Sequence, residues 1–239
     1  MKVNLTPISF LSFFCLVFLI HEVHDWAHYW TAASFCGCLG NRIFDSWAPC
    51  IRCNSPTWGL TLATLAGPII NYLVIWSGWV MMHPDNLPEK QSAGYCMVFA
   101  ALPLPQIMAA MSGGGDTTWA LRQLFQRPTG NSHYIVAASG LLLVVLLCLP
   151  ALIRAFMLVA GWVQRIVCFL LFLIVPGMVD HWLVSKELNK LMANGFLSHQ
   201  ILRGGAQLFL FVWMAVVLIL YLLTRKSLQT LLEPKEASV

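Results

Sequence analysis

Charged residues are scarce in this chain, since Asp, Glu, Lys and Arg make up only 10% of its 239 residues while 59% are hydrophobic. So low a charged fraction excludes an ordinary soluble domain, in which about a quarter of the residues are charged. The net charge of +4 comes from scattered Lys and Arg, so no nucleic-acid surface is indicated. No polar stretch is long enough to form a separate soluble domain. These absences indicate an integral membrane protein.

Long apolar runs account for nearly the whole chain, and each approaches the roughly 20 residues that a helix needs to cross a bilayer. The first run begins near Pro7 and no small-residue cleavage site follows it, so we expect a retained helix and not a secretory signal. We therefore expect an all-α, multi-pass membrane protein, with residues 1–239 forming one domain of about six transmembrane helices. The runs lie at about 7–34, 57–81, 93–112, 134–153, 156–179 and 205–223.

The first run contains the sequence HEVHDWAH at residues 21–28, which places three imidazoles and two carboxylates inside an apolar segment. On a helix, His21, His24, Asp25 and His28 share one face, because they are separated by steps of three, four and seven residues. Ionisable groups at membrane depth are costly and therefore typically functional. We expect this face to carry the chemistry of the protein.

Two registers of a zinc motif fit the cluster. In the favoured register, HDxxH, His24 and His28 bind zinc and Asp25 accepts the proton of a bound water, as the acid does in HExxH. In the alternative register, His21 and Asp25 are ligands and Glu22 is the base. The first is favoured because two imidazoles are the commoner zinc pair. The structural alternative is that the histidines only form hydrogen bonds to neighbouring helices.

Polar residues also occur in the next two runs. Gly67-Pro68 and Asn71 lie in the second, where they either serve ordinary helix packing or aim an amide at the interior. Gly115-Asp116 follows the third, where Asp116 is either a helix cap or a ligand. If the first three runs each cross the membrane, the third ends on the same side as the first. Asp116 then lies on the same side as His24. Two imidazoles, one carboxylate and a water would form an open catalytic zinc site.

Taken together, HDxxH, the Gly67-Pro68-x-x-Asn71 element and Gly115-Asp116 resemble the site-2-protease family of intramembrane zinc metallopeptidases. The resemblance covers about the first half of the chain. Asp25 stands where the family has Glu, and Gly115-Asp116 reverses the family's Asp-Gly order. The resemblance implies a metallopeptidase-like core over 1–126, followed by further helices over 127–239.

The resemblance also implies roles for individual residues. His24, His28 and Asp116 would bind Zn²⁺, Asp25 would be the catalytic base, and Asn71 would contact substrate. The implied activity is hydrolysis of peptide bonds in transmembrane or membrane-proximal segments, with membrane proteins or peptides as partners inside the lipid bilayer. The alternative is a catalytically inactive metal-binding scaffold of the same fold, since Asp25 is one methylene shorter than Glu.

Two further features have several interpretations. Cys36, Cys38, Cys50 and Cys53 follow the first run and would form a small zinc site, two disulfides or free thiols. We expect them to be structural and separate from the catalytic zinc. Asp180-His181, in the second half, falls on the side of the histidines, where it either approaches the site or, as we expect, forms an interfacial polar pair. Lys and Arg divide almost evenly between the two sides, so the positive-inside rule selects no orientation.

Overall fold

A computed structural model describes residues 1–125, 131–201 and 207–233 of the chain. Within these residues, five helical spans are long and apolar enough to cross a membrane, and a sixth apolar helix is shorter. The predicted all-α, multi-pass class is therefore confirmed. The spans are α1 (Pro7–Cys36), α2 (Thr57–Met81), α3 with α4 (Pro88–Ala100, Pro103–Met111), α6 (Asn131–Leu158) and α7 with η1 and α8 (Trp162–Asp180, His181–Leu188, Asn189–Ala193); the shorter helix is α9 (Leu208–Thr224).

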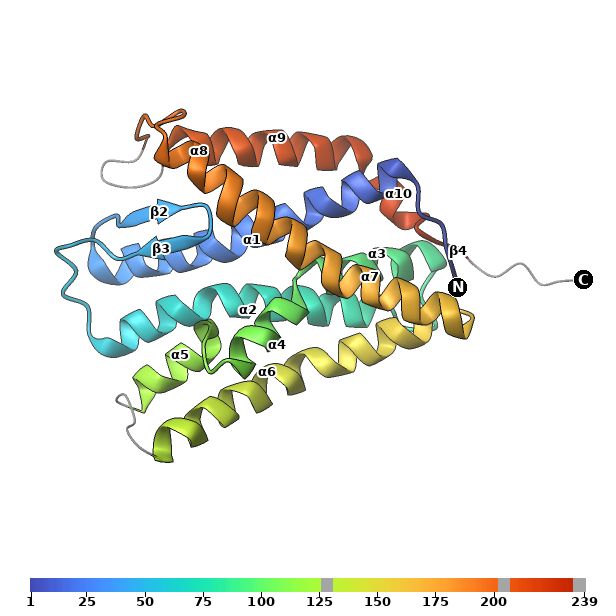
Figure 1. The fold of residues 1–239 in the computed structure, drawn as a ribbon, viewed down its shortest axis with the longest axis horizontal. Coiled ribbons are helices and arrows are strands. Elements are labelled where there is room, and N and C mark those ends of the chain that lie inside the picture. The colour runs from blue at the N-terminus through green and yellow to red at the C-terminus, as the bar shows by residue number, and fades with distance from the viewer. Residues whose placement is uncertain (126–130, 202–206, 234–239) are drawn as a thin grey trace, which may run out of the picture.

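The central helix of the bundle is α1, which lies between α2 and α9, while α6 packs on the far side of α2 (Figure 1). Its start is fixed by a capping box between Thr6 and Ser9, with Pro7 in the first turn. Its end is fixed by Gly37, which adopts the left-handed conformation. Because α1 is apolar on most of its circumference and carries many buried side chains, burial at the centre stabilises it best.

The third run is predicted to be one helix, but the structure divides it into α3 and α4 at Leu102. Leu102 has a φ of 52°, and Pro103 beside it has no N–H to continue the helix. The carbonyl of Ala101, freed by the break, accepts a hydrogen bond of 2.9 Å from the Gln106 amide. Irregular backbone at membrane depth is tolerated where it lines a cavity, and Ala101 and Leu102 both line the one described below.

A hairpin of two short strands, β2 (Asn41–Ile43) and β3 (Ser46–Ala48), connects α1 to α2. Disulfides join Cys36 to Cys53 and Cys38 to Cys50 at its base. Of the three predicted states of these cysteines, the structure shows the two disulfides. The other four cysteines are free and buried, as small apolar side chains would be: Cys15, Cys96, Cys148 and Cys168.

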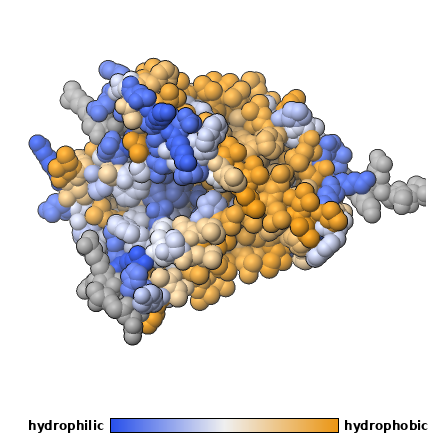
Figure 2. Space-filling view, in the orientation of Figure 1, coloured by the Kyte–Doolittle hydropathy of each residue, from blue (hydrophilic) through white to orange (hydrophobic). Residues whose placement is uncertain are grey.

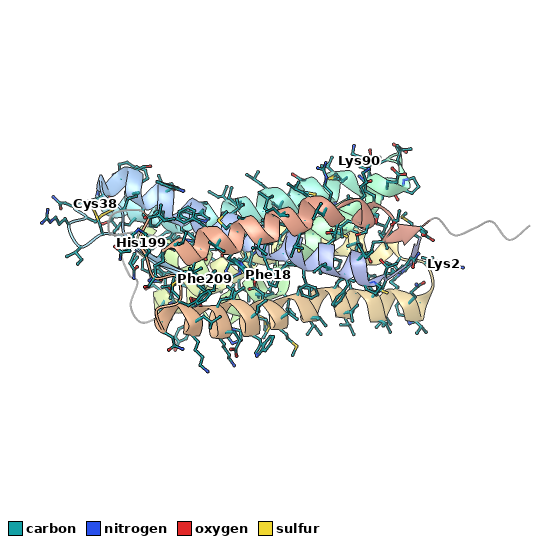
Figure 3. The ribbon with its side chains drawn as sticks, turned by 90° about the horizontal axis from the view of Figure 1, so that it is seen from above. Lys2, Phe18, Cys38, Lys90, His199 and Phe209 are labelled. Atoms are coloured by element: carbon teal, nitrogen blue, oxygen red, sulfur yellow. A yellow bond between two sulfur atoms is a disulfide. The ribbon has the colours of Figure 1, made fainter. Side chains whose placement is uncertain are left out.

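The remaining short elements are α5 (Gly115–Leu124), α10 (Lys226–Gln229) and the paired strands β1 (Lys2–Val3) and β4 (Leu232–Glu233). Seen from above, Cys38 lies at one end of the bundle, whereas Lys2 and Lys90 lie at the other (Figure 3). This distribution agrees with the predicted order of crossings. The surface is apolar around the middle of the molecule, and hydrophilic surface gathers around a hollow near the end that carries β2 and β3 (Figure 2).

Candidate metal centre

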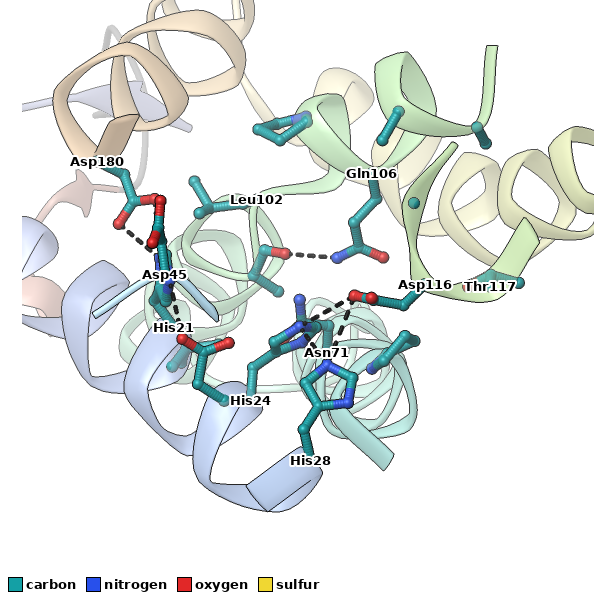
Figure 4. Close-up of a pocket in the computed structure, with 18 of the residues that line it drawn as sticks. His21, His24, His28, Asp45, Asn71, Leu102, Gln106, Asp116, Thr117 and Asp180 are labelled. Carbon is teal, nitrogen blue, oxygen red and sulfur yellow. Dashed lines mark hydrogen bonds and ion pairs between the residues drawn. The ribbon is translucent and has the colours of Figure 1, made fainter. Parts of the chain in front are cut away.

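A cavity of about 650 Å³ opens among α1, α2, α4, α5, α7 and the hairpin. Its volume is in the usual range for small-molecule and substrate sites. The side chains of the HEVHDWAH face reach it from α1, while α5 and α7 each contribute a carboxylate (Figure 4). The polar lining includes His21, His24, His28, Asn71, Asp116 and Asp180. The structure therefore brings together side chains that are up to 159 residues apart in the sequence.

His24, His28 and Asp116 point at one another inside this cavity (Figure 4). The two Nε2 atoms are 3.0 Å apart, and Oδ2 of Asp116 is 3.5 Å from each of them. Ligands of a tetrahedral zinc ion, at bond lengths of about 2.0–2.2 Å, lie about 3.3–3.6 Å from one another. The three atoms therefore form a triangle close to one face of a zinc tetrahedron. The donor set of two imidazoles and one carboxylate also fits zinc.

The surroundings of His28 hold its ring in the orientation that a metal ligand needs. Its Nδ1 lies 2.7 Å from the carbonyl oxygen of Ala63 in α2, so Nδ1 carries the proton and Nε2 keeps its lone pair. Trp47 of β3 stacks on the ring at 5.4 Å between centroids. Gly67 of α2 packs so closely on the two rings that an added Cβ would meet both His24 and His28. Glycine at position 67 is therefore required by the close approach of α2 to the two imidazoles.

Asp116 reaches the histidines because three glycines turn the chain sharply after α4. Gly113 and Gly115 have φ values of 73° and 75°, which favour glycine. The residue that precedes α5 is Gly114, and no side chain caps the helix there. Asp116 is therefore not a helix cap, which was its alternative role. Burial raises the pKa of Asp116, but contacts with His24 and His28 outweigh burial and hold that pKa below its usual range.

Asp25 is 5% exposed and lies beside the triangle. One ligand atom from each of His24, Asp25 and His28 lies within 4.8 Å of the others, so Asp25 would be either a fourth ligand or a neighbour of an ion held there. Its Oδ2 has no hydrogen-bond partner among the described residues. The nearest charged groups are His21 Nε2 at 3.5 Å and Arg42 at 3.7 Å.

Glu22, the base of the alternative register, has a different environment. It is 2% exposed, and its Oε2 accepts a hydrogen bond of 2.6 Å from Arg42 on β2. It does not line the cavity. Arg42 is fully buried and also stacks on Trp26 at 4.3 Å. Glu22 is thus accounted for as the partner of a buried arginine that fixes the hairpin to α1.

The electrostatic balance of this region favours a cation. Glu22, Asp25 and Asp180 are each less than 9% exposed, and in the described part of the chain only one arginine, Arg42, and one histidine, His21, form ion pairs with them. Buried charges are costly unless they are paired or bind a metal. A divalent ion near Asp25 and Asp116 would reduce this imbalance.

Asn71 and Asp180 complete the polar lining. Asn71 is 7% exposed, and its Oδ1 has no hydrogen-bond partner in the described residues, so it is free to bind a molecule in the cavity. Asp180 contacts His21 in the cavity (Figure 4), so of its two interpretations the structure has the approach to the site. The only signal of Asp180 in the sequence was that it is a single acid at the end of an apolar run.

Comparisons with protein-family models, with characterised proteins and with solved structures find no match to this chain.

Proposed function

We propose that this protein is a membrane-embedded zinc-dependent peptidase that hydrolyses peptide bonds in transmembrane or membrane-proximal segments. The observation that carries the proposal is the triangle of His24 Nε2, His28 Nε2 and Asp116 Oδ2 inside a cavity among membrane-length helices. Three protein ligands leave a tetrahedral ion one open position, which is typical of catalytic zinc sites. A carboxylate next to the triangle adds a group that can accept a proton.

Five polar residues of the cavity have a part in this reaction. Zinc held by His24, His28 and Asp116 would polarise a water molecule and the substrate carbonyl. Asp25 accepts the proton of the attacking water and returns it to the leaving amine. Asn71, with its unpaired amide oxygen, binds a backbone N–H of the substrate. The substrate segment must be unwound, because a helix hides its carbonyls in hydrogen bonds.

One experiment tests the metal site. Zinc content is measured on the detergent-purified parent and on His24→Ala, His28→Ala and Asp116→Ala, with His83→Ala, an exposed histidine in the turn after α2, as the matched control. We expect the parent and the control to hold one zinc and the three site variants to lose it. Unchanged zinc in all three would refute the site. His21→Ala and Asp25→Ala are measured alongside, and loss of zinc in these two alone would support the alternative register.

The same samples separate a peptidase from an inactive scaffold, the second candidate function. The observation that favours a scaffold is Asp25, which is shorter than Glu and lies between His21 and Arg42. The probe is a synthetic single-span peptide with a fluorophore and a quencher on either side of its apolar stretch. Cleavage by the parent that disappears in the zinc-free variants supports the peptidase. Bound zinc without cleavage of single-span probes supports the scaffold.

A further inference from the structure

His21 lies between two carboxylates that come from different parts of the chain (Figure 4). Its Nδ1 is 2.8 Å from each carboxylate oxygen of Asp180 on α7. Its Nε2 is 3.5 Å from Oδ2 of Asp25, one helical turn further along α1. All three side chains line the cavity of the candidate metal centre. The imidazole therefore connects a carboxylate of α7 to the carboxylate beside the metal ligands.

Asp180 is in an unusual position for a residue that would only join two helices. It is 6% exposed and ends a stretch, 166–179, that contains no charged residue. The π-helix η1 begins at the next residue, and π-helical turns inside helices are frequent at functional sites. A lone carboxylate at membrane depth is costly and is therefore retained for a purpose.

We propose that Asp180 is a positioning residue for Asp25 and acts through His21. A carboxylate faces each ring nitrogen of His21, which favours the imidazolium form. Its Nδ1–H then donates a hydrogen bond to Asp180, so the imidazole cannot rotate freely and its Nε2–H stays turned towards Asp25. The Oδ2 atom of Asp25, 3.5 Å from Nε2, has no hydrogen-bond partner in the described residues. Carboxylates that hold a histidine from the side away from a metal centre act in the same way. The proposal rests on the proposed function, in which Asp25 accepts the proton.

A purely structural role makes a different prediction. If the Asp180–His21 contact only held α7 against α1, its loss would lower the melting temperature and would act independently of Asp25. If Asp180 positions Asp25, removing either carboxylate removes the same interaction. The two changes are then not additive, although no contact joins the two carboxylates directly. A double-mutant cycle measures this non-additivity.

The experiment uses the zinc-loaded protein and acetohydroxamate, which chelates a divalent metal through its two oxygens and offers N–H and O–H donors to a neighbouring carboxylate. Affinity is measured by calorimetry for the parent, Asp180→Asn, Asp25→Asn and the double variant, with zinc content and melting temperature on the same samples. Glu187→Gln, which changes the acid of the adjoining π-helix η1, is the matched control. Cleavage of the quenched single-span peptide is recorded in parallel.

We expect each single variant to weaken acetohydroxamate about tenfold, the magnitude typical of groups behind a metal site. The double variant should be no weaker than Asp25→Asn, Asp180→Glu should recover part of the affinity, and zinc content should not change. The proposal would be overturned if the two losses of affinity multiplied in the double variant. It would also be overturned if Asp180→Asn lost zinc, or if Asp180→Asn bound acetohydroxamate as tightly as the parent. If the parent binds zinc and shows this coupling but cleaves no probe, the positioning role stands and the peptidase proposal falls. A parent without zinc refutes both.

Discussion

Replacing Gly67 by alanine should disturb the metal centre without removing any ligand. An added Cβ would lie 2.7 Å from His24 Nε2, whereas ordinary contact begins at 3.4 Å, and it would lie closer still to His28. Both imidazoles must therefore move, that of His24 by about 0.7 Å and that of His28 by more, because α2 cannot withdraw without losing its packing against α1. Metal–ligand distances are held to within about 0.2 Å. We expect zinc affinity to fall about tenfold to a hundredfold, as it does when groups behind a metal site are changed.

The assay is competition for Zn²⁺ with a chromophoric chelator, followed in detergent together with thermal unfolding. Gly78→Ala is the matched control, because it lies on the same helix about 16 Å away at 1.5 Å per residue. Its Cβ would meet the Gly94 carbonyl oxygen at 2.6 Å and Val98 at 2.9 Å. Both variants should lose about 1–3 kcal/mol of stability through overpacking, but only Gly67→Ala should lose zinc. If Gly67→Ala bound zinc as tightly as the parent, the two imidazoles would not form a metal site with this geometry.

Three further changes have distinct expected outcomes. Asp25→Asn should keep zinc but lower cleavage of the single-span probe by about a hundredfold to ten-thousandfold, the usual effect of removing a general base. Asp25→Glu should retain cleavage. If Asp25→Asn cleaved the probe as well as the parent does, another residue would be the base. Arg42→Met should lower the free energy of unfolding by about 3–5 kcal/mol, because it leaves Glu22 buried without its partner, and Glu22→Gln in the same chain should restore much of that loss. Replacing Cys38 and Cys50 by Ser should lower thermal stability but leave one zinc per chain, and a fall in zinc content would contradict the separation of the disulfides from the metal centre.

The sequence predicts that His24, His28 and Asp116 lie close together because two kinds of regularity determine their positions. Helical periodicity places His24 and His28 on one face of α1, and the number of membrane crossings brings Asp116 to the same side. Both arguments use only local pattern and topology. The structure then adds the distances, 3.0 Å and 3.5 Å, that local pattern does not contain.

Other features depend on contacts that periodicity does not encode. The partner of His21 is Asp180, which is 159 residues away, and the relative rotation of α1 and α7 decides whether they meet. The partner of Glu22 is Arg42, which lies in the connecting hairpin. The hairpin strands are too short for their period to predict where the Arg42 side chain points. The break at Leu102 was missed because α3 and α4 together have the length and apolarity of one span. Pro103 and Pro105 were the local signals of that break.

The two disulfides bear on the direction from which the cavity is reached. Disulfide bonds persist in oxidising spaces and are rare in the cytosol. Both bridges lie at the base of the hairpin that borders the cavity. The two bridges therefore predict that the end of the bundle that carries the hairpin faces the exoplasmic side of the membrane, an orientation that the even spread of Lys and Arg does not oppose. On the proposed function, substrate segments and the metal would then reach the cavity from the lumen, the periplasm or the cell exterior, outside the reach of cytosolic thiols that compete for zinc.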